Sequence, residues 1–465
     1  MQEIDRSQRV TVAGAGLVGS LLAMYLARRG FQVDILERRP DMRREAIDAG
    51  RSINLAISTR GLHALRQVGL EEEALRHAIP MRGRMIHPVS GELAFQAYGK
   101  DESQHINSLS RAWLNKFLMT HAEGTGRVRI EFKQRVQHVD LEKGTLSVLD
   151  EASGTARELR TSVVFGTDGA GSAVRHALER LPGHAMGQEQ LGHGYKELTI
   201  PAGPGGAFRM EKHALHIWPR GSYMLIALPN EDGSFTCTLF LPFHGPVSFE
   251  SLDSPERVKA FFEQQFPDVV PLIPDLVHDF FHHPTGTMVT VKSAPWHVDG
   301  KVALLGDAAH AIVPFFGQGM NCGFEDCVAL DDCLGRHARW ADAFEEFFRL
   351  RKTNADAIAD MAVENFVEMR DKTADARFLL EKAVEKVLLN AFPGEFLSRY
   401  TLVSFSRVPY RLAYEVGAIA GGIVAELCEG ITRVGDVDLE RARTLIRERL
   451  VPFVKEHSDG FGLEG

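Results

Sequence analysis

Three glycine-rich segments, far apart in the chain, carry residue types that bind a dinucleotide. The first, GAGLVG at residues 14–19, is a GxGxxG motif between a predicted strand and a predicted helix. Gly14 permits a tight turn, Gly16 lets a pyrophosphate approach the backbone, and Gly19 allows the helix to pack closely on the strand. Glu37 ends the next predicted strand and could accept both ribose hydroxyls. This acid disfavours a 2′-phosphate, so the motif predicts FAD or NAD rather than NADP.

The second and third segments each place an aspartate after a short apolar run. Residues 166–175 (GTDGAGSAVR) centre on Asp168, and alone they would be interpreted as an ordinary Asx-type turn. Residues 301–321 (KVALLGDAAHAIVPFFGQGMN) contain Asp307 and then a glycine turn that is typical of a helix start, where backbone N–H groups and the helix dipole favour an anion. His310 is interpreted as a structural histidine. The three segments together indicate one flavin site.

Composition limits the class of protein. The 465 residues, 44% hydrophobic and 25% charged, suit a soluble globular enzyme of two domains. The net charge of −9 argues against nucleic acid or an anionic membrane as a partner. The polar start predicts no signal peptide, and the apolar stretch at Val416–Val424 is too short to span a bilayer. Five cysteines without a CxxC pair fit a reducing, cytoplasmic location with no disulfide framework and no metal site.

Hydrophobic periodicity and turn residues predict the elements that must position these segments. A βαβ unit is expected at the N-terminus, and an Asp232-Gly233 hairpin is expected within an antiparallel region over Gly194–Pro242. Further strands are expected over Arg127–Leu149 and Ser162–Phe165. Helices are expected over Leu17–Arg29, Ser58–Ala78, Arg111–Ala122, Pro255–Phe266, Phe344–Met369 and much of the C-terminal third.

The order and wide separation of the three segments resemble those of the FAD-dependent class A aromatic monooxygenases, over about residues 8–370. The resemblance implies that Asp168 helps to hold the dinucleotide and that Asp307 bonds the ribityl chain. It also implies that the glycine turn places a helix start at the N1–C2=O edge of the flavin. The remaining implied cofactor contacts are Arg38, Leu55, Arg111, Gly317, Gly319, Met320 and Asn321. NADPH would bind transiently, since this family has no separate nicotinamide domain.

The same resemblance implies an α/β fold. It would have a Rossmann-like FAD-binding domain, an inserted antiparallel β-sheet substrate domain and a helical C-terminal region. We assign residues 1–180 to FAD binding, interrupted at about 80–110 by part of the substrate domain. Residues 181–295 would form the β-sheet domain, 296–370 would return to FAD binding, and 371–465 would form the helical region.

Shorter strings narrow the resemblance to soluble bacterial members that hydroxylate L-kynurenine. They include RSINLA at 51–56, MRGRM at 81–85, GYKEL at 194–198 and ENFVEM at 364–369. Such members hold the substrate carboxylate group with an arginine, two tyrosines and an asparagine. The matching residues are Arg84, Tyr98, Asn365 and Tyr400, with Arg82 as a neighbouring alternative. The aromatic ring would lie among Ile106, Leu215, Leu228, Phe240, Phe315 and Met369. One departure is Phe316, where some members have histidine.

The implied reaction is hydroxylation of L-kynurenine to 3-hydroxykynurenine. It would consume NADPH and O2 and pass through a flavin C4a-hydroperoxide. No residue is predicted as a strong base, because the aniline nitrogen already activates the ring carbon. One alternative is a class A monooxygenase for another aromatic amine or a phenol, although phenol chemistry favours a proton-removing Tyr or His chain. Another alternative is a flavin-binding redox sensor, which would lack the carboxylate contacts. The oligomeric state is not predicted.

Overall fold

A six-stranded sheet brings the three glycine-rich segments together. The computed structural model describes residues 2–45, 54–99, 102–368 and 376–461. The strand order is β18-β19-β12-β1-β2-β8. These strands are β1 (Arg9–Ala13), β2 (Gln32–Glu37), β8 (Val128–Phe132), β12 (Val164–Gly166), β18 (His297–Val298) and β19 (Val302–Leu304). Pairing is parallel from β19 through β12, β1 and β2 to β8, so the carboxyl ends of the first four lie at one edge. A dinucleotide binds at this edge of an open parallel sheet.

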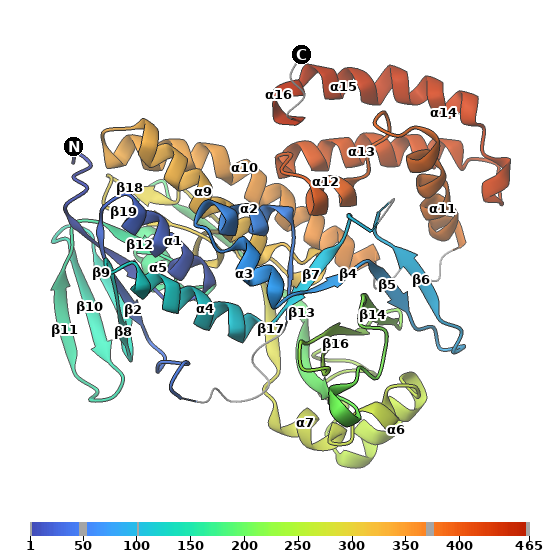
Figure 1. Ribbon diagram of the computed structural model, residues 1–465, viewed down its shortest axis with the longest axis horizontal. Coiled ribbons are helices and arrows are strands. Elements are labelled where there is room, and N and C mark those ends of the chain that lie inside the picture. The colour runs from blue at the N-terminus through green and yellow to red at the C-terminus, as the bar shows by residue number, and fades with distance from the viewer. Residues whose placement is uncertain (1, 46–53, 100–101, 369–375, 462–465) are drawn as a thin grey trace.

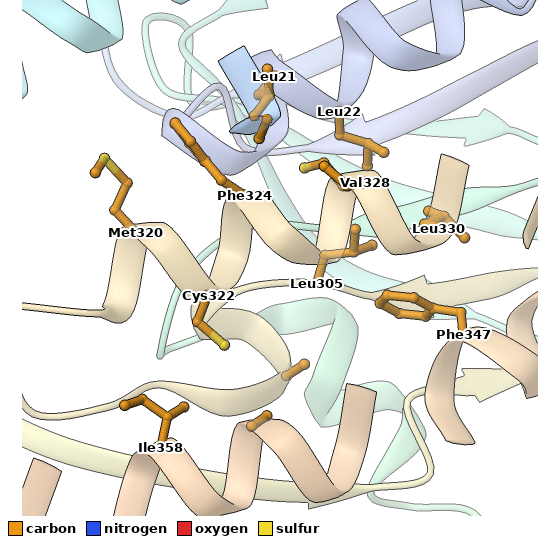
Figure 2. Packing of buried hydrophobic residues seen from close by; sticks show 14 of the residues in the cluster. Leu21, Leu22, Leu305, Met320, Cys322, Phe324, Val328, Leu330, Phe347 and Ile358 are labelled. Carbon is orange, nitrogen blue, oxygen red and sulfur yellow. The ribbon is translucent and has the colours of Figure 1, made fainter. Parts of the chain in front are cut away.

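Helices cover this sheet (Figure 1). They include α1 (Leu17–Arg28), α4 (Arg111–Gly124), α5 (Ala173–Leu178), α9 (Gly319–Arg336) and α10 (Trp340–Val367). Figure 2 shows Phe324 of α9 on the side of Leu21 of α1, while Cys322 projects the other way, toward Ile358 of α10. Both faces of α9 are therefore buried, which fixes the glycine turn that precedes it.

A seven-stranded sheet forms the second layer, in the order β17-β13-β16-β15-β14-β5-β6. Its strands are β5 (Gly83–Ile86), β6 (Ala94–Ala97), β13 (Ala185–Ile200), β14 (Ala214–Pro219), β15 (Met224–Pro229), β16 (Phe235–Pro242) and β17 (Gly286–Ala294). Side chains alternate between its faces. Leu225 and Leu239 pack in one core with residues of α6 (Pro255–Gln265) and α7 (Leu276–His282), whereas Ile226 and Phe240 belong to clusters on the opposite face. That opposite face holds the predicted substrate slot.

Two small sheets and a helical lobe complete the described chain. The sheets are β3-β7-β4, made of β3 (Leu55–Ile57), β4 (Ile79–Met81) and β7 (Ile106–Leu109), and β9-β10-β11, made of β9 (Gln134–Asp140), β10 (Thr145–Asp150) and β11 (Ala156–Arg160). The C-terminal helices, red in Figure 1, are α11 (Ala376–Ala391), α12 (Arg399–Phe405), α13 (Tyr410–Leu427), α14 (Leu439–Leu445), α15 (Val451–Glu456) and α16 (Ser458–Phe461). Among the described residues, no helix is both long and apolar enough to cross a bilayer.

Most of the predicted elements are confirmed, including the N-terminal βαβ unit, the β15–β16 hairpin and the α/β class. The single helix expected over Ser58–Ala78 is wrong. The chain forms α2 (Thr59–Gln67) and α3 (Glu71–Arg76), because Gly69 turns between them with a φ of 79°. The long helix α10 begins earlier than expected, at Trp340, and the expected end at Met369 lies outside the described residues. The domain division stays a prediction.

Candidate functional site

The GxGxxG turn is closely packed at Gly14 and Gly19 and open at Gly16. A Cβ on Gly14 would lie 2.9 Å from the Thr167 carbonyl oxygen, and one on Gly19 would lie 2.0 Å from the Gly14 carbonyl oxygen. By contrast, a Cβ on Gly16 would meet nothing within 4 Å. Thr167 Oγ1 donates to the Ala13 carbonyl at 2.8 Å and holds the turn to β12. The tight turn and the open approach at Gly16 fit a pyrophosphate group.

Glu37 lies buried at the end of β2 with both carboxylate oxygens engaged. Oε2 accepts the Ala15 N–H at 2.8 Å, and Oε1 accepts the backbone and side-chain N–H groups of Arg39 at 2.9 and 2.8 Å. Oε2 keeps a further acceptor site, and the predicted ribose contact stays a prediction. Arg38, which the sequence predicted as a cofactor contact, is exposed. The residue that pairs with Glu37 is Arg39, which the sequence analysis did not single out.

Asp168 has one satisfied oxygen and one orphaned oxygen. Oδ2 accepts the Ala173 N–H at 2.8 Å at the start of α5, while Oδ1 is buried without a hydrogen-bond partner. Burial raises the pKa of Asp168. Arg175 donates to the Ala170 carbonyl at 2.6 Å and to the Ala308 carbonyl at 3.0 Å. This arginine therefore ties the second glycine-rich segment to the third.

A buried aspartate supports the turn that presents Asp307. Asp307 is exposed and begins α8 (Asp307–His310), a one-turn helix after β19. Asp326 Oδ2 accepts the Gly306 N–H at 2.9 Å and lies 2.5 Å from His310 Nε2, so it contacts both ends of this helix. Burial alone would lower the pKa of His310, but Asp326 raises it well above its usual value. His310 therefore has a buried carboxylate as its structural partner.

The same aspartate belongs to a buried chain of charges. Arg351 donates to Asp326 at 2.8 Å and to Glu325 at 2.6 Å, and Glu325 accepts Arg60 at 2.7 Å. Cys322 Sγ, with His310 and Asp326, places three possible metal-ligand atoms within 4.8 Å of one another. Arg351 contacts two of these three residues, so a divalent cation would lie beside a fixed positive charge. We interpret the group as an ionic network.

Asn321 fastens the third glycine turn to β3 and α2. Its Oδ1 accepts the Ser58 N–H at 2.9 Å, and its Nδ2 donates to the carbonyls of Ala56 and Gly317, each at 2.9 Å. The preceding Gln318 accepts the Tyr410 hydroxyl at 2.8 Å, which links the turn to α13. The side chain of Asn321 thus shapes the turn, while the open backbone donors are those of the helix start. The other predicted cofactor contacts are placed as follows: Gly319 begins α9, Met320 is buried in its first turn, Leu55 is partly buried on β3, and Arg111 is exposed at the start of α4.

Arg84, Tyr98 and Tyr400 meet although they come from β5, the end of β6 and α12. The Arg84 guanidinium carbon lies 5.6 Å from the Tyr98 ring centre and 5.1 Å from that of Tyr400, and the two rings stack at 5.2 Å. Arg84 Nε and the Tyr98 hydroxyl are buried without a hydrogen-bond partner. Burial raises the pKa of both tyrosines, so both phenols are neutral donors at neutral pH. Arg82 instead pairs with exposed Glu102 at 3.3 Å.

Asn365 reaches this group through the loop before the glycine turn. Its Nδ2 donates to the Phe315 carbonyl at 2.6 Å, and the neighbouring Phe316 ring lies 5.9 Å from the Tyr400 ring at an interplanar angle of 26°. Phe316, which the sequence analysis singled out, therefore packs beside Tyr400, a predicted ligand of the substrate carboxylate group. We call Arg84, Tyr98, Asn365 and Tyr400 the clamp.

The predicted ring contacts fall into two adjoining clusters. Ile106 and Leu228 are buried together, with Leu215 and Tyr98 packed against them. Phe240 and Phe315 form the second cluster, with their ring centres 4.9 Å apart. Ile226 packs against both clusters and joins them. Register explains part of this arrangement, because Leu215 pairs with Arg84 where β14 runs parallel to β5. Met369 lies outside the described residues.

Comparison with known proteins agrees with this geometry. The family model of the FAD binding domain matches residues 7–199 and 269–346. A solved structure of 2-methyl-3-hydroxypyridine-5-carboxylic acid oxygenase is 21% identical, with a TM-score of 0.63 over 79% of this chain and 94% of that one. PqsL of P. aeruginosa, in complex with 2-aminobenzoylacetate, is 22% identical, with a TM-score of 0.58 over 78% and 97%. These likenesses concern the fold alone.

Curated relatives are far more similar. A kynurenine 3-monooxygenase of Myxococcus xanthus is 73% identical over 460 residues, which cover 99% of each chain. Kynurenine 3-monooxygenases of Xanthomonas campestris pv. campestris and Dictyostelium discoideum are 46% and 45% identical over 96% of this chain and 98% and 99% of theirs.

The fold and the matched domain define an FAD-dependent monooxygenase of the class A aromatic hydroxylases. Within that class, the chain belongs to the kynurenine 3-monooxygenase family.

Proposed function

We propose that this enzyme hydroxylates L-kynurenine to 3-hydroxykynurenine with NADPH and O2, and that the clamp binds the substrate carboxylate group. One observation carries the assignment of the clamp. Arg84 Nε and the Tyr98 hydroxyl are buried, adjacent and without hydrogen-bond partners. Orphaned buried donors cost free energy, and an amino acid carboxylate group would satisfy both. A guanidinium binds carboxylates with charge-assisted bonds, often in pairs.

The chain's own residues would bind and orient the reactants and exclude water from them. Bound FAD supplies the electron transfer from NADPH and the activation of O2. The open approach at Gly16 and the exposed Asp307 would hold the dinucleotide, and the backbone donors at the start of α9 would face the isoalloxazine. The apolar clusters around Leu228 and Phe315 would hold the aryl ring and exclude water. The assigned residues leave the ring activated by its own amine, with no protein base.

The test is direct. The purified protein should carry FAD and should oxidise NADPH in a kynurenine-dependent manner, with 3-hydroxykynurenine formed. If NADPH oxidation instead responds to a phenol or another aromatic amine in a substrate screen, the proposed substrate is wrong. Bound FAD without any hydroxylated product would favour a redox sensor. A cytoplasmic location remains a prediction from the sequence.

A further inference from the structure

An ion pair lies directly behind two residues of the clamp. Glu364 precedes Asn365 on α10, and Arg399 precedes Tyr400 on α12. Glu364 Oε2 accepts Arg399 Nη1 at 2.5 Å, and Glu364 Oε1 accepts the Tyr414 hydroxyl of α13 at 2.9 Å. We call Glu364, Arg399 and Tyr414 the latch. It joins three helices at the point where two of them supply clamp residues.

The packing around Arg399 is built for this contact. The Arg399 guanidinium carbon lies 5.1 Å from the Tyr414 ring centre. The side chain crosses α13 at Gly417, where a Cβ would lie 2.4 Å from Arg399 Nε and 2.9 Å from Arg399 Cβ. Only a residue without a side chain leaves this path open. The hydrogen bond that Tyr414 donates to Glu364 also raises the pKa of Tyr414, so this hydroxyl remains a donor.

Two other contacts hold α12, one near each end. Arg60 donates to the Val403 carbonyl at 3.3 Å, and Ser398 caps the first turn by accepting the Thr401 N–H at 3.1 Å. Neither contact fixes the first turn of α12 against α10. Among the described contacts, the latch supplies a charged link between the helix with Asn365 and the helix with Tyr400.

We propose that the pair of Glu364 and Arg399 positions the clamp and thereby sets the affinity for the carboxylate group of the substrate. The inference rests on the proposed function, since it deepens the role of the clamp. Glu364 and Arg399 act through their neighbours in the chain, Asn365 and Tyr400, so they are positioning residues. Their side chains are 41% and 24% exposed, so water screens the pair and its loss should leave the fold intact.

The experiment measures ligand dissociation constants of the FAD-loaded protein by titration of the flavin absorbance. The ligands are L-kynurenine and kynuramine, which lacks the carboxylate group. Glu364→Gln should raise the dissociation constant of L-kynurenine about fivefold. This factor corresponds to about 1 kcal/mol of lost pairing. Kynuramine affinity and FAD content should not change. Gly417→Ala, which displaces Arg399, should act in the same direction and serves as a second variant if the first fails to fold.

Two controls make the result specific. Glu415→Gln breaks the pair of Arg411 and Glu415 on the exposed side of α13, so it should change neither affinity. Exchanging the charges, with Glu364→Arg and Arg399→Glu together, should restore part of the L-kynurenine affinity. The proposal is overturned if Glu364→Gln weakens both ligands equally, or if it weakens neither. If the unaltered protein binds kynuramine as tightly as L-kynurenine, the clamp assignment itself is wrong. The proposed role of the latch is then wrong as well.

Discussion

Replacing Arg84 by methionine tests the clamp most directly. Methionine keeps much of the length and the apolar stem but removes the guanidinium. Arg84 Nε has no hydrogen-bond partner in the protein, but the guanidinium packs against the Tyr98 and Tyr400 rings, so urea unfolding of the FAD-free variant is measured beside its affinity. Charge-assisted hydrogen bonds contribute about 1.5–3 kcal/mol each, so losing one should raise the dissociation constant of L-kynurenine about 10- to 150-fold.

The chain offers a matched control two residues away. Arg82 lies on the same stretch of chain but pairs with exposed Glu102, so Arg82→Met should change affinity less than about twofold. Titration of the flavin absorbance gives the dissociation constants, and kynurenine-dependent NADPH oxidation gives KM and kcat. Kynuramine should bind the Arg84 variant as well as it binds the unaltered protein. An Arg84→Met variant with unchanged L-kynurenine affinity, or with equal losses for both ligands, would refute the assignment.

Three further changes probe the cofactor side and the fold. Asp307→Ala should reduce FAD retention, followed by flavin fluorescence, without altering urea unfolding of the FAD-free protein, because the side chain is exposed. Asn321→Ala should also destabilise the FAD-free protein, by about 3 kcal/mol, because the three hydrogen bonds of this buried side chain are lost; an unfolding midpoint equal to that of the unaltered protein would contradict this. Burial lowers the pKa of His216 from 6.5 to about 4, beside His87, which pairs with Asp268. The unfolded chain therefore takes up a proton first, and about 3 kcal/mol of unfolding free energy should be lost as pH falls from about 6.5 to 4; urea unfolding of His216→Asn should lack this share of the pH slope.

The meeting of the three glycine-rich segments could be predicted from the sequence because each follows a short apolar strand. Parallel strands present their carboxyl ends at one edge, so Gly14, Asp168 and Asp307 had to be neighbours once the sheet was parallel. The chemistry of Arg39 and Asp326 could not be predicted in this way. Arg39 gains its role from the turn that follows Glu37, and Asp326 gains its role because α9 places it against Gly306, just after β19.

The sequence also could not predict which distant strands pair with each other. Leu215 lies beside Arg84 because β14 pairs in parallel with β5, and no local pattern encodes the partner of a strand. The stacking of Tyr98 on Tyr400 likewise depends on how the helical lobe packs on the sheet. Sequence reasoning found these residues through their resemblance to a family, and their roles stay predictions. The resemblance assigned the latch no role, although Glu364 begins the string ENFVEM, and Glu364 and Arg399 are ordinary surface residue types.

The predicted cofactor contacts and the predicted substrate contacts differ in their position relative to the matched FAD binding domain. Every predicted cofactor contact, from Gly14 to Asn321, lies inside the ranges that match the general FAD binding domain, 7–199 and 269–346. Of the clamp, Arg84 and Tyr98 lie inside those ranges, whereas Asn365 and Tyr400 lie beyond them; Leu215 lies in the gap between the ranges. Binding FAD is a task shared across the family, whereas selecting an amino acid substrate is not. If the proposed clamp is right, the helical lobe does more than cover the sheet: it supplies Tyr400, one of the two clamp tyrosines, and the latch that would orient this helix for carboxylate recognition.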